Sequence, residues 1–239
     1  MQRIIWIAFR RFFPIIGLLF QLNWYSREKH RNYEKAYDLV SKACHKVMKV
    51  ARITPIYEGV ENVPKEDGFI FYPNHQGLFD VLLFLDSSPK RFAFVIKKES
   101  SNIILLKQII ASIGSLVIDR KDLKQSFALI KEMTKQVKEG RNFIIFAEGT
   151  RSRKGNEMLP MKGGSFKAAI NAKCPIVPCA LIDSYRAFDE KGIARKTVRL
   201  IYLPPILYEE YKDMKSQEIA DEVKRRIEAT IQNVENTTL

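Results

Sequence analysis

The chain has 239 residues, of which 46% are hydrophobic and 28% are charged, enough for the buried core of one large domain or of one domain with an appendage. This composition excludes a disordered chain, a fibrous protein and a polytopic membrane protein. Lys and Arg number 40 against 27 Asp and Glu, and the net charge of +13 indicates an anionic partner: nucleic acid, an anionic bilayer or a phosphorylated substrate.

The three cysteines, Cys44, Cys174 and Cys179, are too few for a disulfide scaffold, which excludes a small secreted module. They are typical of reduced thiols in a cytosolic setting. Neither Cys174 nor Cys179 has a histidine or a second cysteine pair nearby, so the sequence predicts no zinc site.

The positive charge is concentrated at the N-terminus. Residues 1–53 hold 11 Lys or Arg and 3 Asp or Glu, so this stretch carries 11 − 3 = +8 of the total. Its first 25 residues are also very apolar. Nucleic-acid binding needs basic residues interleaved with exposed aromatic ones across one face. Because the excess charge here lies beside a hydrophobic segment, the pattern favours lipid over nucleic acid.

The apolar N-terminal segment is interrupted by charge and by helix breakers. A helix over residues 4–25 would reach about 33 Å, just enough for a bilayer core. Arg10 and Arg11 fall near its middle at a cost of about 2.5–3.5 kcal/mol each, and Pro14 and Gly17 break it. No small-residue cleavage site follows, which argues against a signal peptide. We predict an uncleaved, half-inserted membrane anchor; a spanning helix and an ordinary core helix are the alternatives. The side chains expected at the interface are Trp6, Trp24 and Tyr25.

Residues 31–52 form the next predicted helix. Apolar side chains recur at helical spacing along it, and lysines fall largely on another face. The lysines either face solvent or contact anionic headgroups, at about 1 kcal/mol per cation. The apolar positions are Tyr33, Ala36, Tyr37, Val40, Cys44, Val47, Met48 and Ala51.

From about residue 53, short apolar runs alternate with amphipathic ones. This alternation predicts an α/β fold: a mostly parallel mixed sheet flanked by helices, with an N-terminal membrane-anchoring helical segment. Thr54-Pro55 ends the helical pattern, so we expect an anchor over residues 1–52 and an α/β domain over 53–239. Residues 183–196 are predicted to be a surface loop. The predicted strands are Gly68–Tyr72, Phe92–Ile96, Ser115–Ile118, Asn142–Phe146, Ile176–Leu181 and Val198–Leu203. The predicted helices are Leu78–Leu85, Asn102–Ile113, Leu123–Glu139, Ser165–Ala172 and Ser216–Val234, the last as an outer layer.

The end of the first predicted strand of this domain carries His75, and Asp80 follows five residues later across a turn. A neutral imidazole takes a proton near pH 7, and a carboxylate on its other nitrogen fixes its tautomer. This is two thirds of a serine-type triad without the serine, so the hydroxyl would belong to the substrate. The alternative is a helix-capping aspartate beside a hydrogen-bonded loop histidine.

Two further strand ends carry arginine. Arg120 ends one strand, and Glu148-Gly149-Thr150-Arg151 follows another. A guanidinium matches phosphate bidentately, so two such ends on one sheet indicate a phosphate site. Glu148 is expected to orient the arginine or to hold the loop. Pro178, inside a strand-like run, predicts an edge or bulged strand beside the site.

Four segments together resemble the glycerolipid acyltransferases. The segment from Asn74 to Asp80 resembles their NHxxxxD block, and the segment from Glu148 to Arg151 resembles their EGTR block. Val117-Ile118-Asp119-Arg120 and Ile176-Val177-Pro178-Cys179-Ala180 resemble two more blocks, in the family's order. The resemblance covers about residues 50–205 and is closest to the bacterial lysophosphatidate acyltransferases.

The resemblance implies that His75 is the general base on the sn-2 hydroxyl of lysophosphatidate and that Asp80 orients it. It implies that Arg120 and Arg151 bind the acceptor phosphate. Glu148, Gly149 and Thr150 would shape the pocket, with Lys98 as a further phosphate contact. Lys97-Lys98-Glu99 and Gly114 are kept, but a proline typical of that segment is missing, which puts the local helix packing in doubt. Lys162, before Gly163-Gly164-Ser165, also resembles a family segment, either as an anion site or as a buried loop.

The same resemblance implies an acyl-CoA or acyl-carrier-protein donor, no metal or redox cofactor, no nucleic acid, and a peripheral or monotopic place on the cytoplasmic face of the cell membrane, against anionic lipid. Two alternatives stay open. One is an acyltransferase with another acceptor, such as glycerol 3-phosphate or a lyso-aminolipid. The other is a lipid-binding module without catalysis.

Overall fold

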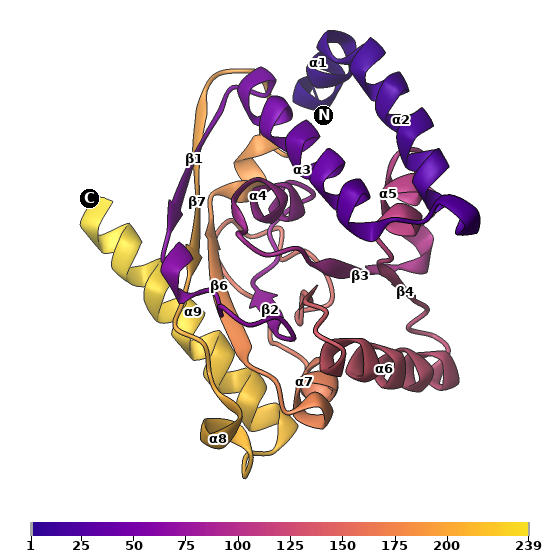
Figure 1. Cartoon of the computed structure of the whole chain (residues 1–239). Helices are drawn as coiled ribbons and strands as arrows, with labels where there is room; N and C mark the ends of the chain where they lie inside the picture. Colours follow the sequence, from indigo (N-terminus) through magenta and orange to yellow (C-terminus); the bar gives the residue numbers. More distant parts are fainter. Residues whose placement is uncertain (1, 239) are drawn as a thin grey trace.

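The protein is a three-layer α/β structure preceded by three helices (Figure 1). The computed structural model describes residues 2–238. The predicted strands and helices are found, with ends shifted by up to four residues, and the structure adds a strand over residues 53–58 where only a boundary was predicted. The predicted α/β class with a mostly parallel mixed sheet is confirmed.

Seven strands form one sheet in the order β1-β7-β6-β2-β5-β3-β4. Neighbouring strands are parallel except for the antiparallel β6–β7 pair. The strands are β1 (Ile53–Glu58), β2 (Ile70–Pro73), β3 (Ala93–Lys97), β4 (Leu116–Ile118), β5 (Phe143–Ile144), β6 (Ile176–Ile182) and β7 (Lys196–Tyr202). The carboxyl ends of β2, β3, β4, β5 and β6 therefore meet at one edge of the sheet.

Pro178 does not mark an edge strand, because β6 lies between β7 and β2. Its carbonyl accepts a hydrogen bond from Leu203 on the β7 side. The N–H and C=O of one strand residue point to the same side, so the missing N–H removes no bond to β2. Registered pairing with β7 begins one residue later, at Cys179. The expectation of an edge position is thus wrong, and the proline costs the sheet little.

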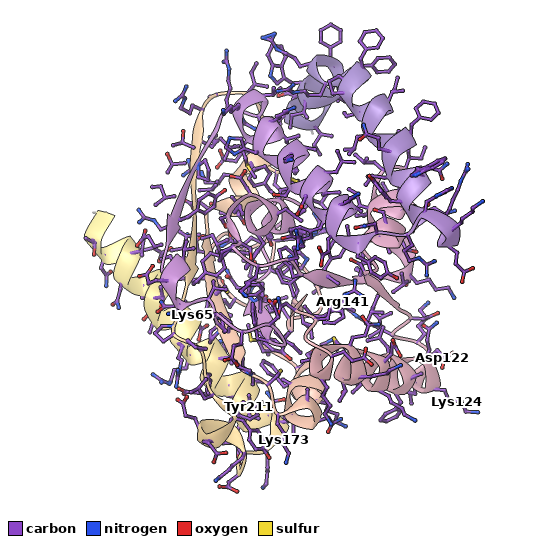
Figure 2. All side chains as sticks on the ribbon, in the orientation of Figure 1. Lys65, Asp122, Lys124, Arg141, Lys173 and Tyr211 are labelled. Carbon is purple, nitrogen blue, oxygen red and sulfur yellow. The ribbon has the colours of Figure 1, made fainter. Side chains whose placement is uncertain are left out.

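Alternate residues of the central strands supply two cores, one on each face of the sheet. Phe71 belongs to the core on the α3–α4 side, whereas Ile70 and Tyr72 belong to the core under α6, α7 and α9. The described helices are α1 (Gln2–Arg10), α2 (Phe12–Ser26), α3 (Tyr33–Val50), α4 (Asp80–Ser87), α5 (Leu106–Ser112), α6 (Leu123–Lys138), α7 (Lys167–Ala172), α8 (Tyr208–Tyr211) and α9 (Ser216–Thr238). Tyr211, labelled in Figure 2, fastens α8 by donating to the Cys174 carbonyl at 2.6 Å.

The amphipathic helix predicted over residues 31–52 is α3, and its stripe is buried as expected: Tyr37, Val40, Cys44 and Met48 join the same core as Phe71. Burial raises the pKa of the Cys44 thiol to about 12, which keeps that thiol unreactive. The division into residues 1–52 and 53–239 stays a prediction.

The N-terminal segment is a bent helix pair. In the part of the chain that the structure describes, no single helix is long and apolar enough to cross a bilayer; α1 and α2 pass that test only together, across an 80° bend. Aromatic rings project outward from both helices (Figure 2), and Phe9 and Phe13 are 80% and 81% exposed. The opposite side of α1 is hydrogen-bonded to the rest of the protein. The Trp6 indole N–H donates to the Val50 carbonyl at 3.1 Å, and the buried Arg3 guanidinium donates to the Ala51 and Ala194 carbonyls.

The predicted surface loop 183–196 differs from the structure at both ends. It opens with a 3-10 turn, Ser184–Ala187, in which Ser184 and Ala187 are fully buried, and Lys196 already belongs to β7. Of these two buried side chains, Ser184 is polar and Ala187 is small, so the turn has no apolar run that a hydropathy pattern could detect.

Phe71→Ala is expected to lower the free energy of unfolding by about 3–5 kcal/mol, as is typical of a buried aromatic residue. Phe71 is fully buried and contacts the rings of Phe69, Phe84, Phe92 and Tyr202. The matched control is Phe127→Ala, the same change at a side chain that is 62% exposed on α6. Urea unfolding monitored by circular dichroism measures both, and equal losses would contradict this view of the core.

Candidate active site

The residues predicted from strand ends lie at the carboxyl edge of the sheet, where α/β proteins bind their ligands. His75 follows β2, Arg120 follows β4, and Glu148 follows β5. The turn after β6 completes the edge with Ser184. The parallel arrangement of these four strands is what brings segments more than 100 residues apart to one place.

His75 and Asp80 form the expected pair. Nδ1 of His75 lies 2.8 Å from Oδ2 of Asp80, whose side chain is fully buried, while the His75 side chain is 21% exposed. Phe146 lies against the imidazole, with ring centroids 4.1 Å apart. Among residues 2–238, no protein group hydrogen-bonds the Nε2 atom of His75. A proton on Nδ1, hydrogen-bonded to Asp80, would leave Nε2 as the ring nitrogen able to accept a proton.

Asp80 is held by its own loop. It is the first residue of α4, and its Oδ2 also accepts from the backbone N–H groups of Gln76 and Gly77, at 2.8 and 3.0 Å. These backbone donors fix the rotation of the buried carboxylate. The spacing of five residues between His75 and Asp80 therefore allows their contact, because the turn between them wraps round the carboxylate and brings the ring of His75 to it.

Glu148 holds the loop. Its Oε1 accepts from the backbone N–H of His75 at 2.7 Å, and its Oε2 accepts from the N–H of Leu159 at 2.8 Å. Burial raises the pKa of Glu148, and the two backbone donors oppose that shift. Of the two roles expected for this side chain, the structure places it in the loop-holding one; its part in shaping an acceptor pocket stays a prediction.

Gly149 lies where two cations converge. Its φ of +79° belongs to the left-handed region that favours glycine, and its carbonyl accepts from the Arg120 guanidinium. A Cβ at this position would lie 3.2 Å from Nη1 of Arg120 and 3.2 Å from Nζ of Lys162. We call Arg120, Gly149 and Lys162 the cationic cradle. Neither cation forms an ion pair within the described chain, and unpaired cations of this kind are typical of anion sites.

The other predicted phosphate contacts lie around this cradle. Lys98 is exposed and forms an ion pair with Asp119 at 3.0 Å, beside Arg120 in the chain. Thr150 is exposed, and Arg151 is partly buried. The next residue, Ser152, donates its N–H to the His75 carbonyl at 2.9 Å, which places the backbone of Arg151 near the histidine. A phosphate role for Arg151, Thr150 and Lys98 stays a prediction.

Sequence reasoning missed four polar residues that join the loops. Asn74 exchanges two hydrogen bonds with the backbone of Leu181, at 2.9 and 2.7 Å. The Gln76 amide donates to the Leu181 carbonyl at 2.9 Å and to Asn156 at 2.8 Å, and its oxygen accepts from the N–H of Ser184 at 2.8 Å. Asn74 and Gln76 flank His75 in the recognised block, which was the available signal. Asn156 and Ser184 carry no signal in the sequence.

No cofactor site stands out beside this pair. Within residues 2–238, no group of three or more His, Cys, Asp or Glu side chains is placed to hold a metal ion. The expectation that no metal or redox cofactor is needed stays a prediction.

The fold and the matching sequence family together define the class of enzyme to which this chain belongs. The model of the acyltransferase family matches residues 55–182, more than half of the chain, and the protein belongs to that family. The matched range contains His75, Asp80 and the whole cationic cradle.

Curated relatives carry one recurring name. The chain is 30% identical to the 1-acyl-sn-glycerol-3-phosphate acyltransferase of Helicobacter pylori strain J99, over 61% of this chain and 65% of that protein. It is 31% identical to the protein of the same name from Escherichia coli K12, over 68% of this chain and 66% of that protein. The chain thus spans about two thirds of each relative. The crystal structure of the 1-acyl-sn-glycerophosphate acyltransferase of Thermotoga maritima is similar with a TM-score of 0.70 over 96% of this chain and 98% of that one, at 22% identity, which shows the shared fold.

Glu148→Gln is expected to lower acyltransferase turnover roughly tenfold or more. An amide has one acceptor oxygen, so one of the two buried backbone N–H groups is left without a partner, at about 1–3 kcal/mol, and the His75 loop shifts. Glu157→Gln is the matched control, because Glu157 is exposed in the same loop and, among residues 2–238, forms its ion pair with Lys154 at 3.0 Å. Steady-state kinetics of the two variants, with circular dichroism to confirm folding, make the comparison; equal turnover in both would contradict the loop-holding role.

Proposed function

We propose that this protein transfers a fatty acyl group from an acyl thioester to the sn-2 hydroxyl of lysophosphatidate, giving phosphatidate. The observation that carries the proposal is the position of the His75–Asp80 pair beside the cationic cradle: one binds a proton, the other an anion. The names of the relatives support the acceptor, and family membership supports acyl transfer.

In the proposed mechanism, His75 acts as the general base. Its Nε2 takes the proton of the acceptor hydroxyl as that oxygen attacks the thioester carbonyl carbon. The C–O bond forms, the tetrahedral intermediate collapses, and the C–S bond breaks. The imidazolium then returns its proton to the leaving thiolate. The buried Asp80 carboxylate stabilises the imidazolium between these two proton transfers, and no acyl-enzyme is formed.

The cationic cradle is proposed to bind the acceptor phosphate. Charge-assisted bonds from Arg120 and Lys162 would orient the glycerol so that its free hydroxyl faces Nε2 of His75. Gly149 leaves room for the phosphate between the two cations, since a side chain there would contact both. Arg151 and Lys98 are proposed as outer cations of the same site, reached once the substrate is bound.

The membrane supplies the acceptor in this proposal. Exposed aromatic side chains on α1 and α2, together with the charge of +8 over residues 1–53, suit a monotopic attachment to anionic lipid at the cytoplasmic face. An enzyme attached in this way takes an amphiphilic acceptor from the bilayer surface while its thioester donor, acyl-CoA or acyl-carrier protein, arrives from water.

His75→Ala is expected to lower the rate of acyl transfer at least 100-fold, because the acceptor hydroxyl loses its general base. The assay supplies a long-chain acyl thioester with lysophosphatidate and, side by side, with glycerol 3-phosphate or a lyso-aminolipid. His45→Ala is the matched control, since His45 is exposed on α3 and pairs with Asp86 at 3.0 Å. The proposed reaction and the general-base role of His75 are both supported if lysophosphatidate is the one acceptor that gives product and if the wild type and His45→Ala, but not His75→Ala, form phosphatidate from it. Turnover on glycerol 3-phosphate alone would refute the acceptor, and wild-type turnover by His75→Ala would refute the base.

Lys162→Ala is expected to raise KM for lysophosphatidate roughly 10- to 100-fold with a smaller change in kcat, the loss of one charge-assisted bond of about 1.5–3 kcal/mol. Lys162 is exposed and forms no ion pair in the described chain, so the change costs the fold little. Lys162→Arg keeps the charge and is expected to restore most binding. Lys191→Ala, at an exposed lysine in the loop before β7, controls for net charge. An equal KM increase in the Lys191 variant would show a nonspecific charge effect.

A further inference from the structure

Ser184 is a fully buried serine whose hydroxyl reaches the catalytic pair from the far side. Its Oγ donates to Oδ1 of Asp80 and lies 3.0 Å from Oε1 of Gln76. A hydroxyl has one proton, and both neighbours are acceptors. The contact to Asp80 is the shorter one and ends on a charged oxygen, so the proton points to the carboxylate.

The two oxygens of Asp80 have separate partners. Oδ2 accepts from the His75 ring and from two backbone N–H groups, whereas within residues 2–238 the hydroxyl of Ser184 is the partner of Oδ1. Four donors thus fix the rotation of this carboxylate. Ser184 supplies the one that comes from a different strand end.

The turn that carries Ser184 is built to aim it inward. Asp183, directly before it, has a φ of +62°, a left-handed conformation that non-glycine residues adopt rarely. The Asp183 N–H donates to Asn156 at 2.9 Å, and the Ser184 N–H donates to Gln76 at 2.8 Å. The backbone is therefore held in place by the same residues that surround His75, and it delivers the hydroxyl to Asp80.

We propose that Ser184 is a positioning residue of the active site, which holds Asp80 so that its other oxygen faces His75 and which shares the negative charge of the carboxylate. Ser184 does not touch the reacting atoms. It acts through Asp80 on the affinity of His75 for a proton, and its consequence for acyl transfer rests on the proposed function.

The charged groups that face the pair are few. His75 comes from the loop after β2, Asp80 from α4 and Glu148 from the loop after β5, and Ser184 approaches from the turn after β6. Glu148 accepts from two backbone donors and forms no hydrogen bond with Ser184 among the described residues. Removal of the hydroxyl leaves the charge of Asp80 less stabilised, and the pair then holds its proton to higher pH.

The test is the titration of His75 in the full-length protein, followed by NMR of histidine labelled with carbon-13 and assigned with His75→Ala. Ser184→Ala is expected to raise the His75 midpoint by about one pH unit, the scale of one lost hydrogen bond to a charged group. Ser184→Thr keeps the hydroxyl and is expected to titrate like the wild type. His30 and His45 serve as internal references, and Ser112→Ala is the matched control, because Ser112 is an equally buried serine on α5.

Ser184→Cys, a near-isosteric change to a weak donor, covers the case in which the alanine variant fails to fold, and it is expected to shift the midpoint in the same direction by less. The acid limb of kcat/KM for acyl transfer should move upward with the NMR midpoint. An unchanged His75 midpoint in folded Ser184→Ala or Ser184→Cys, with stability alone reduced, would overturn the proposal. If the wild type transfers no acyl group, the proposed function fails, but the NMR shift still decides the role of Ser184.

Discussion

The buried carboxylate of Asp80 is the constraint on which the active site depends. An ionised group with no exposed surface costs several kcal/mol unless donors surround it. Here the donors are the His75 ring, the N–H groups of Gln76 and Gly77, and the Ser184 hydroxyl. The loop after β2 has to fold round the carboxylate to supply three of them, and that same fold sets the imidazole at the edge of the sheet.

A second buried carboxylate secures the other end of the histidine. Asp80 binds the ring and Glu148 binds the backbone, so His75 is fixed at both its functional and its main-chain atoms. Glu148 directly precedes Gly149, the glycine of the cationic cradle. The carboxylate that holds the His75 backbone and the glycine that lies against Arg120 and Lys162 are therefore neighbours in one short turn.

Local patterns predicted the parts of this site that lie within one loop. The five-residue spacing of His75 and Asp80 was sufficient because both partners belong to one turn and one helix start. Ser184 was not predictable, since its contact spans 104 residues and arises only from the order of strands in the sheet. The prediction from Pro178 was wrong for a related reason. A proline within a strand indicates an edge strand unless it is known which neighbouring strand its missing N–H would have faced. Lys162 lies beside Gly149 because the chain turns back between these two residues. From the sequence alone, an anion site and a buried loop remained equal alternatives for Lys162.

The attachment of α1 has a mechanical consequence. Arg3 and Trp6 bond to the carbonyls of Val50, Ala51 and Ala194, at the end of α3 and in the loop before β7. These bonds hold the N-terminal helices in a fixed position against the rest of the protein, in place of a flexible connection. In the proposed attachment, the outer face of α1 and α2 rests on a lipid surface, so the protein itself would set the height and tilt of the catalytic edge above that surface. The depth from which an acceptor headgroup is taken would then be a fixed dimension of the molecule.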